Sequence, residues 1–166
     1  ARKHKSLVLE LIDIFSVIQS STSNYSLPMQ LYSPSKNIQL RVQLTDKIYY
    51  AVDFQGQNVM WFSPLSLTLA DGTVFGAHPK ILNQSEQKIK ETIETAWGIR
   101  SHVLNDYAEL VLEMEGGYSV IFRVYDDGVA YRFRSHLDRT IKVTEEEVAF
   151  RFLEDHPLVA HVVGDF

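Results

Sequence analysis

Five aromatic residues of this sequence have side chains that could stack on the apolar face of a sugar ring: Trp61, Phe62, Trp97, Tyr107 and Tyr125. Aromatic side chains serve core packing more often than ligand contact. Trp61 and Trp97 differ from the others because each lies beside turn-forming residues, Ser63-Pro64 after Trp61 and Gly98 after Trp97. We therefore take these two tryptophans as candidate sugar-contacting or interface-contacting residues, with core packing as the alternative.

Acidic residues and histidines that could act in catalysis or hold a metal ion are better explained by local structure. Asp126 and Asp127 precede a glycine, which is the pattern of a tight hairpin turn. The run Glu145 to Glu147 cannot supply the about 6–8 oxygen ligands of calcium by itself. His156 and His161 lie near aspartates, but their spacing places the imidazoles on opposite sides of a strand. The residues alone indicate no catalytic and no metal site.

Composition excludes several classes of protein. The 166 residues include 45% hydrophobic residues and no cysteine. This apolar content is enough for one domain with a core, and the lack of thiols excludes disulfide scaffolds, thiolate metal sites and cysteine nucleophiles. The net charge of −5 opposes binding to a phosphate backbone, so nucleic acid is not an expected partner. Nucleophile-elbow, zinc-protease and phosphate-loop motifs are absent from the sequence.

Residues 1–26 have a different character from the remainder of the chain. Basic residues precede an apolar run over 7–18, which is the outline of a secretory leader. Glu10 and Asp13 interrupt this run, and its apolar residues also recur at helical spacing, so a docking helix is the alternative. The run is shorter than the about 20 apolar residues of a membrane span. We expect residues 1–26 to be a leader-like or docking segment and residues 27–166 to form the domain.

From residue 33 onward the apolar residues alternate with polar ones, which is typical of strands. The first half of the domain predicts a hairpin from 38–44 and 50–54, then two short strands over 57–62 and 65–69 that Pro64 separates. Residues 73–84 contain glycine, proline and asparagine and predict a loop. The segment 85–96 fits a helix or a strand, and its neighbours favour a strand.

The second half of the domain gives the clearest pattern. Alternation over 110–114, 120–124 and 129–133, with turns at Gly116-Gly117 and at 126–128, predicts a three-stranded antiparallel meander. Ile141 to Val143 and Val148 to Phe152 predict two further strands. Nine or ten short strands with at most one helix, at the N-terminus, indicate an all-β fold, an antiparallel β-sandwich.

The segment Phe122 to Phe133 resembles a signature of the N-terminal domain of family-97 glycoside hydrolases, F-R-x-Y-[DN]-D-G-[VI]-A-[FY]-R-[FY]. The resemblance extends over about residues 33–166, and the sequence departs from the family pattern at Ala108 and near the C-terminal end. Further matching pieces occur in the expected order: Ser33-Pro34, Lys47 to Tyr50, Ser63 to Leu67, Phe75-Gly76, Trp97-Gly98, Tyr107 to Leu110 and Glu145 to Phe152.

This resemblance implies a β-super-sandwich packed on a (β/α)₈ catalytic barrel. Family members resemble α-glucosidases or α-galactosidases, depend on calcium and are commonly periplasmic or exported bacterial enzymes. Their two catalytic carboxyl groups come from the barrel, and the sandwich carboxylate for calcium belongs to a segment that begins just past Phe166. The resemblance therefore assigns no catalytic and no metal residue to this chain.

The expected function is that of a non-catalytic N-terminal domain that supports the catalytic barrel and substrate site of an enzyme acting on α-glucosides or α-galactosides. We expect the chain alone to be inactive and to carry no cofactor, whereas its longer parent needs calcium. The expected partners are the parent's C-terminal catalytic barrel and an oligosaccharide, and the expected location is periplasmic or secreted.

Two alternatives belong to other classes of protein. A stand-alone β-sandwich could bind carbohydrate or another protein through an exposed apolar surface. An independent sugar epimerase on a similar sandwich needs a paired histidine and glutamate, for which His102 with Glu109 or Glu113 are the candidates.

Overall fold

The computed structural model describes residues 27–94 and 102–155. Within these residues the chain forms strands and no helix, which confirms the predicted all-β class. Predictions for residues 1–26, Trp97, His156 and His161 lie outside the described residues. The strands are β1 (Met29–Tyr32), β2 (Ile38–Leu44), β3 (Ile48–Phe54), β4 (Gln57–Leu69), β5 (Val74–Phe75), β6 (Ile81–Glu94), β7 (His102–Met114), β8 (Tyr118–Val124), β9 (Val129–Ser135) and β10 (Val143–Val148).

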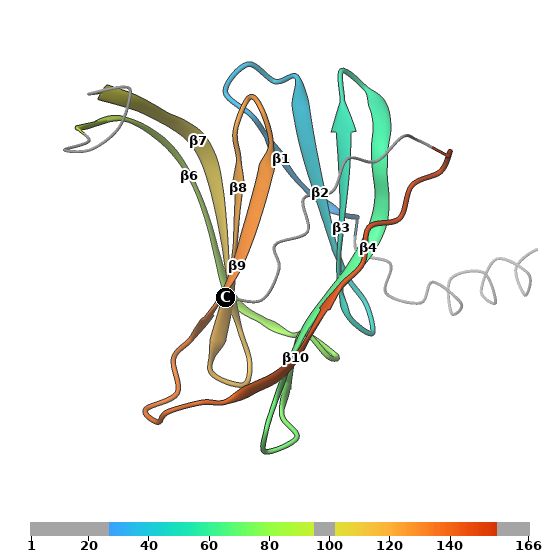
Figure 1. The fold of residues 1–166 in the computed structure, drawn as a ribbon, viewed down its shortest axis with the longest axis vertical. Helices are drawn as coiled ribbons and strands as arrows, with labels where there is room; N and C mark the ends of the chain where they lie inside the picture. The colour runs from blue at the N-terminus through green and yellow to red at the C-terminus, as the bar shows by residue number, and fades with distance from the viewer. Residues whose placement is uncertain (1–26, 95–101, 156–166) are drawn as a thin grey trace, which may run out of the picture.

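The strands form two antiparallel sheets that face each other (Figure 1). The six-stranded sheet has the order β1-β2-β3-β4-β10, with β5 beside β4, and the four-stranded sheet has the order β6-β7-β8-β9. In Figure 1 the four-stranded sheet lies on the left and β1 to β4 lie on the right. The predicted antiparallel β-sandwich is confirmed.

The core lies between the two sheets because alternate residues of each strand face inward. Leu40 and Ile48 of the six-stranded sheet and Leu112 and Phe122 of the four-stranded sheet are fully buried there. The ring of Tyr50 lies 6.3 Å from that of Phe122, so aromatic contacts join the layers. Each such side chain contributes about 1.5–3 kcal/mol when it leaves water, which makes this layer the main source of stability.

The meander of β7, β8 and β9 follows the prediction, including both turns. Gly116 and Gly117 have φ angles of 97° and 76°, a region that glycine adopts at little cost. The β8–β9 turn closes with a hydrogen bond from Tyr125 N to Gly128 O at 2.8 Å. Asp126 Oδ1 also accepts a hydrogen bond from Ser35 N at 2.8 Å, so this turn is tied to the loop between β1 and β2 of the other sheet.

One predicted break is wrong, because β4 runs through Pro64 as a single strand. Proline lacks the N–H of a strand residue and is tolerated at edges and bulges. The register of β4 with β3 shifts between Tyr50 and Val52, next to the Tyr49–Pro64 pair. On the other side of β4, β10 pairs up to Leu65. The bulge and the end of that pairing let the strand continue.

Three other predictions need correction. The predicted loop over 73–84 contains β5 and the start of β6, and the two strands predicted over 141–152 are one strand, β10, with an isolated bridge at Arg151. Glu145 and Glu146, which lie between the two predicted strands, pair with Thr68 and Leu67 of β4. Strand β1 is missed, because its four residues are too few to show alternation.

The ambiguous segment 85–96 is a strand as far as it is described, and it is the most exposed of the long strands. It forms β6, which pairs with β7 from Ile81 to Glu94. Figure 1 shows the far part of this hairpin extending beyond the rest of the sandwich. We call this part, residues 89–94 and 102–107, the arm.

Candidate functional site

Trp61 lies on the outer surface of the six-stranded sheet and is 43% exposed. The bulge in β4 places Trp61 and Phe62 together opposite Ala51, so their rings meet edge to face at 5.4 Å although they are neighbours in sequence. The guanidinium of Arg41 lies 5.7 Å from the Trp61 ring centre and 5.2 Å from that of Phe62. Trp61 therefore belongs to an aromatic surface that a cation covers in part.

Arg41 is held in place by a carboxylate beneath it. Its Nε lies 2.7 Å from Asp53 Oδ2, and its Nη2 donates to Asp53 Oδ1 at 3.0 Å. Asn58 Nδ2 donates to the same Oδ1 at 2.9 Å. Asp53 is buried, so this ion pair is only partly open to water. The group fixes a flat aromatic and guanidinium surface, which is a chemistry that can contact a sugar or a protein.

Trp97, the second tryptophan of the sequence prediction, lies outside the described residues. The structure therefore does not bring the two tryptophans together or separate them. Their roles in sugar or interface contact stay predictions.

A second group of polar side chains lies on the outer surface of the four-stranded sheet. Glu109 of β7 is buried, with Oε2 accepting from Arg123 Nε at 2.7 Å and Oε1 accepting from Gln87 Nε2 at 2.7 Å. Burial alone would raise the pKa of Glu109, but the hydrogen bonds from Gln87 and Arg123 outweigh it and hold that pKa below its usual value. Glu109 is thus a fixed anion that links three strands.

The aromatic residues around Arg123 are covered rather than open. The Arg123 guanidinium lies 4.5 Å from the ring centre of Tyr107, and the Tyr125 ring lies 5.0 Å from that of Tyr107. Tyr107 is only 3% exposed, so its ring face is not available to a sugar. Tyr107, one of the five aromatic residues considered for sugar stacking, therefore serves packing instead.

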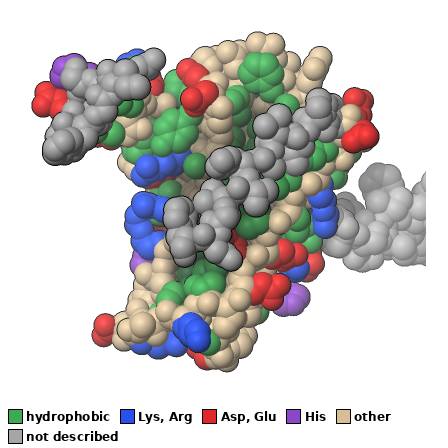
Figure 2. All heavy atoms as spheres, in the orientation of Figure 1, with side chains coloured by type: hydrophobic (Ala, Val, Ile, Leu, Met, Phe, Trp, Pro, Cys, Tyr) green, Lys and Arg blue, Asp and Glu red, His purple; other side chains and the backbone are tan. Residues whose placement is uncertain are grey.

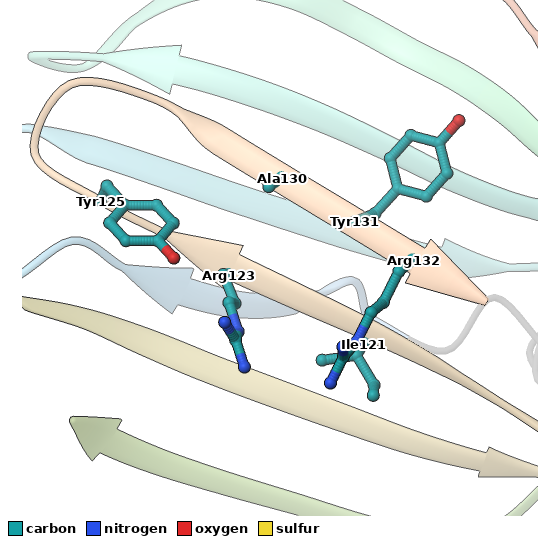
Figure 3. A pocket seen from close by; sticks show the side chains of 6 residues that line it. All are labelled: Ile121, Arg123, Tyr125, Ala130, Tyr131 and Arg132. Carbon is teal, nitrogen blue, oxygen red and sulfur yellow. The ribbon is translucent and has the colours of Figure 1, made fainter. Parts of the chain in front are cut away.

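A small pocket of about 160 Å³ opens beside this group. Its lining comes from β8, β9 and the turn between them: Ile121, Arg123, Tyr125, Ala130, Tyr131 and Arg132. Figure 3 shows Arg123 and Arg132 extending in the same direction from neighbouring strands, with Tyr131 pointing away. Ala130 pairs with Arg123, and its short side chain leaves the space open. Ligand pockets usually measure about 300–1,000 Å³, so this one has room for a single side chain or a small ion.

The Glu109–Arg123 pair is absent from the residues that the sequence singles out as an interacting pair. Alternation shows that both residues leave the core face, but not that they meet. The available signal is that Glu109 and Arg123 are equally distant from Gly116, because a hairpin centred on that turn makes them cross-strand partners.

A serine and a histidine also meet, but without the geometry of a catalytic pair. Ser119 Oγ lies 2.6 Å from His136 Nε2. Ser119 is 1% exposed, so a substrate cannot reach its hydroxyl. No carboxylate orients His136 among the interactions of the described residues, as a nucleophile with a general base would require. The contact is structural.

The epimerase alternative is not supported by the positions of its candidates. His102, Glu109 and Glu113 lie on one strand, β7, and the glutamates follow His102 at odd offsets of seven and eleven positions. Side chains at such positions face opposite sides of a sheet. Glu109 is in addition fully engaged by Arg123 and Gln87. These residues do not form an acid–base pair.

Residues of the described ranges do not assemble a metal site. No group of three or more histidines, aspartates or glutamates there is placed to hold a metal ion. The acidic run of β10 is already engaged, because Glu147 binds Lys47 and Ser66 and Glu146 accepts from Tyr131. These carboxylates do not fit calcium. No helix of the described residues has the length and apolarity needed to cross a membrane.

The sandwich has relatives among known proteins. The chain is 31% identical over 125 residues to the retaining alpha-galactosidase of Bacteroides thetaiotaomicron, which covers 75% of the chain and 19% of that enzyme. The chain therefore spans about a fifth of the length of this curated relative.

The chain also spans about a fifth of the length of solved structures with a similar fold. A beta-arabinopyranosidase is 28% identical with a TM-score of 0.67, over 75% of this chain and 21% of the other. A family-97 glycoside hydrolase of Pseudoalteromonas sp. strain K8, solved with panose, is 24% identical with a TM-score of 0.66, over 75% of this chain and 20% of the other. The latter likeness concerns the fold.

The sequence profile of the glycosyl-hydrolase 97 N-terminal domain matches residues 31–163, which is most of the chain. This range includes both sheets of the sandwich apart from the first two residues of β1, the meander signature and the outer-surface groups around Trp61 and Glu109. The chain therefore belongs to the glycosyl-hydrolase 97 N-terminal family.

Proposed function

We propose that this chain is the non-catalytic N-terminal domain of a longer glycoside hydrolase and that it supports the catalytic barrel of that enzyme. The observation that carries this proposal is the ratio of lengths: the chain matches 19% of an alpha-galactosidase with 75% of its own residues. Hydrolysis of a glycoside needs two carboxyl groups about 5–9.5 Å apart on either side of the bond. The buried carboxylates of Asp53 and Glu109 are occupied by arginines, which is consistent with a supporting role.

The parent enzyme is proposed to cleave α-galactosides in preference to α-glucosides. The support is that the relative named above, at 31% identity, is a retaining alpha-galactosidase. Calcium would be held outside residues 27–94 and 102–155, since the carboxylates of these ranges are unsuited to it. We also propose that the parent enzyme is exported or periplasmic.

The test compares two proteins from the same gene. The chain of residues 1–166 and the full-length protein are assayed on p-nitrophenyl α-galactoside and α-glucoside with calcium. We expect turnover by the full-length protein, faster on the galactoside, and no turnover above blank by the chain alone. Clear turnover by the chain, or a reading frame that encodes no barrel after Phe166, contradicts the proposal.

A carbohydrate-binding role of the chain itself is the second candidate, because Trp61 is 43% exposed beside Arg41. Calorimetric titration with maltooligosaccharides tests it. Millimolar or tighter binding that Trp61→Ala abolishes, and that Val59→Ala on the same strand leaves intact, would support sugar contact. Absence of heat leaves the supporting role.

A further inference from the structure

The arm carries apolar side chains where no second sheet covers it. Ile93 and Val103 are cross-strand partners and are 44% and 43% exposed. Leu104, on the opposite face, is 60% exposed. Along β7 the core begins only at Ala108, so these residues contribute nothing to the layer between the sheets.

The side-chain contacts that join the two strands of the arm are polar and do not involve those apolar residues. Lys90 Nζ lies 2.9 Å from Asp106 Oδ2, and Asn105 Nδ2 donates to Glu91 Oε1 at 2.7 Å. A two-stranded ribbon with both faces in water is marginally stable, and selection for solubility alone would favour polar residues at its outward positions. The Ile93–Val103 pair therefore indicates a surface that is covered in the complete protein.

The apolar pair is continuous with the polar group described above. On the same face of the hairpin, Ile93–Val103 is followed by Glu91–Asn105 and then by Ile89–Tyr107. Tyr107 lies under Arg123, whose pocket extends to Arg132. Tyr107 is buried and supports Arg123 from below, so the exposed part of this surface is apolar side chains beside arginines, and arginine is enriched in protein interfaces. Figure 2 shows Lys and Arg side chains gathered on this side of the molecule.

Arg132 is the charged residue of this surface that is free to bind. Its side chain makes no ion pair or hydrogen bond with another described residue, although its charge helps to lower the pKa of Glu109, whereas the Arg123 side chain is bound directly to Glu109. The pocket beside Arg132 has the volume of one side chain. A carboxylate suits it, because a guanidinium binds a carboxylate through two parallel hydrogen bonds.

The partner is argued from the length of the relatives. Their chains are about five times longer than the part that this sandwich matches, so most of the polypeptide lies outside it. A covalently linked domain is present at high effective concentration, so an apolar surface of modest size is enough to dock it. Addition of a strand at the edge of β6 is disfavoured, because Lys88 and Lys90 place charges along that edge.

We propose that the outer face of the arm, formed by Ile89, Ile93 and Val103, docks the C-terminal part of the parent chain, with a carboxylate of that part bound to Arg132. This inference rests on the proposed function, and it adds which surface makes the contact. The other outer surface, around Trp61, is left to solvent or to a ligand.

Hydrogen–deuterium exchange tests the proposal by comparing the full-length protein with the chain of residues 1–166. We expect amides of 89–93 and 103–107 to exchange about tenfold or more slowly in the full-length protein. The double variant Ile93→Asp/Val103→Asp should abolish this difference and lower the melting temperature of the full-length protein. It should leave that of the chain alone nearly unchanged.

Matched variants make the test specific. Val59→Asp alters a side chain of the other sheet with the same 44% exposure, and it should not change exchange in the arm. Arg132→Glu should lower the protection of the arm in the full-length protein. Arg134→Glu, on the same strand but outside the pocket lining, should not.

Each outcome has a distinct meaning. Equal exchange of the arm in both proteins, or equal destabilisation of both by the double variant, overturns the docking surface and leaves the proposed function intact. A gene whose reading frame encodes no further domain overturns the proposed function first, and the docking surface with it.

Discussion

At the residue scale, the most informative side chain is Glu109, because it is a carboxylate fixed on the outer surface of a sheet. Its two oxygens accept hydrogen bonds from Arg123 and Gln87, both at 2.7 Å. A buried ion pair of this kind stabilises little relative to apolar packing, but the loss of one partner leaves the other charge unpaired. Glu109 therefore maintains the position of Arg123 over Tyr107.

Substitution Glu109→Ala should reduce the free energy of unfolding by about 1–3 kcal/mol, because Arg123 and Gln87 lose their partner. Urea unfolding of the chain measures the change. Glu115→Ala is the control: Glu115 pairs with Lys80 at 3.1 Å but both are well exposed, so the loss should stay within about 0.5 kcal/mol. An equal loss in the free energy of unfolding for both substitutions would show that the buried Glu109 pair stabilises the chain no more than an exposed pair.

The pH dependence of this effect follows from the lowered pKa of Glu109 in the folded chain. A carboxyl group with a lowered pKa contributes stability above its unfolded value, here 4.5, and loses it as the pH falls through the folded pKa. The difference between the wild type and Glu109→Gln should be largest near neutral pH and should shrink below pH 4.5. Urea titrations over this range measure it, and a difference that grows toward acid pH would contradict the assignment.

At the scale of elements, β10 is the strand that joins distant parts of the sandwich. Glu147 accepts hydrogen bonds from Lys47 Nζ at 2.7 Å and from Ser66 Oγ at 2.8 Å, and these lower the pKa of Glu147. One residue earlier, Glu146 accepts from Tyr131 of the four-stranded sheet at 3.0 Å. The acidic run that looked like a calcium candidate thus secures an edge strand.

Substitution Glu147→Ala should increase hydrogen exchange of the β10 amides several-fold while the amides of β7 and β8 stay protected. The loss of global stability should be at most about 1 kcal/mol, because Lys47 and Glu147 are both about a third exposed. Glu145→Ala, in the same strand, is the control and should leave exchange unchanged. Faster exchange in β7 as well would mean that the strand is not a separate unit.

Much of the fold, but little of the site, follows from the sequence. Leu110, Leu112 and Met114 all face the core, so alternation was enough to predict the meander. Pro64 predicts a break because its sequence neighbours show neither the bulge opposite β3 nor the end of the pairing with β10, which is distant in sequence. The Glu109–Arg123 pair follows from the β7–β8 hairpin register, but alternation does not show that these side chains bind each other, and the pairing with Gln87 of β6 has no short turn to define it.

At the scale of the whole molecule, the chain is a sandwich with two unlike outer surfaces. One carries the Trp61 and Arg41 group, and the other carries the arm and the Arg132 pocket. The described residues contain no metal-binding group, and the family match extends over residues 31–163. We expect the remainder of the parent to contact the surface with the arm, and the Trp61 surface to face solvent or a ligand.

Removal of calcium should distinguish the chain from the full-length enzyme. We expect a chelator to lower the activity and the melting temperature of the full-length protein and to leave the melting temperature of residues 1–166 unchanged, because a bound ion stabilises only the state that binds it. Differential scanning calorimetry with and without millimolar calcium measures this. A calcium-dependent shift in the chain alone would place a metal site within it.

The return of β10 to β4 has a consequence for how the chain folds. The hairpins of the four-stranded sheet join neighbouring segments, whereas Glu147 meets Ser66 across 81 residues of sequence. Closing so long a loop costs entropy before its contacts form, so the hairpins should assemble early and β10 should join late. Contacts absent from the transition state affect mainly the unfolding rate. The ion pair of Lys47 and Glu147 should therefore slow unfolding of the sandwich more than it speeds folding.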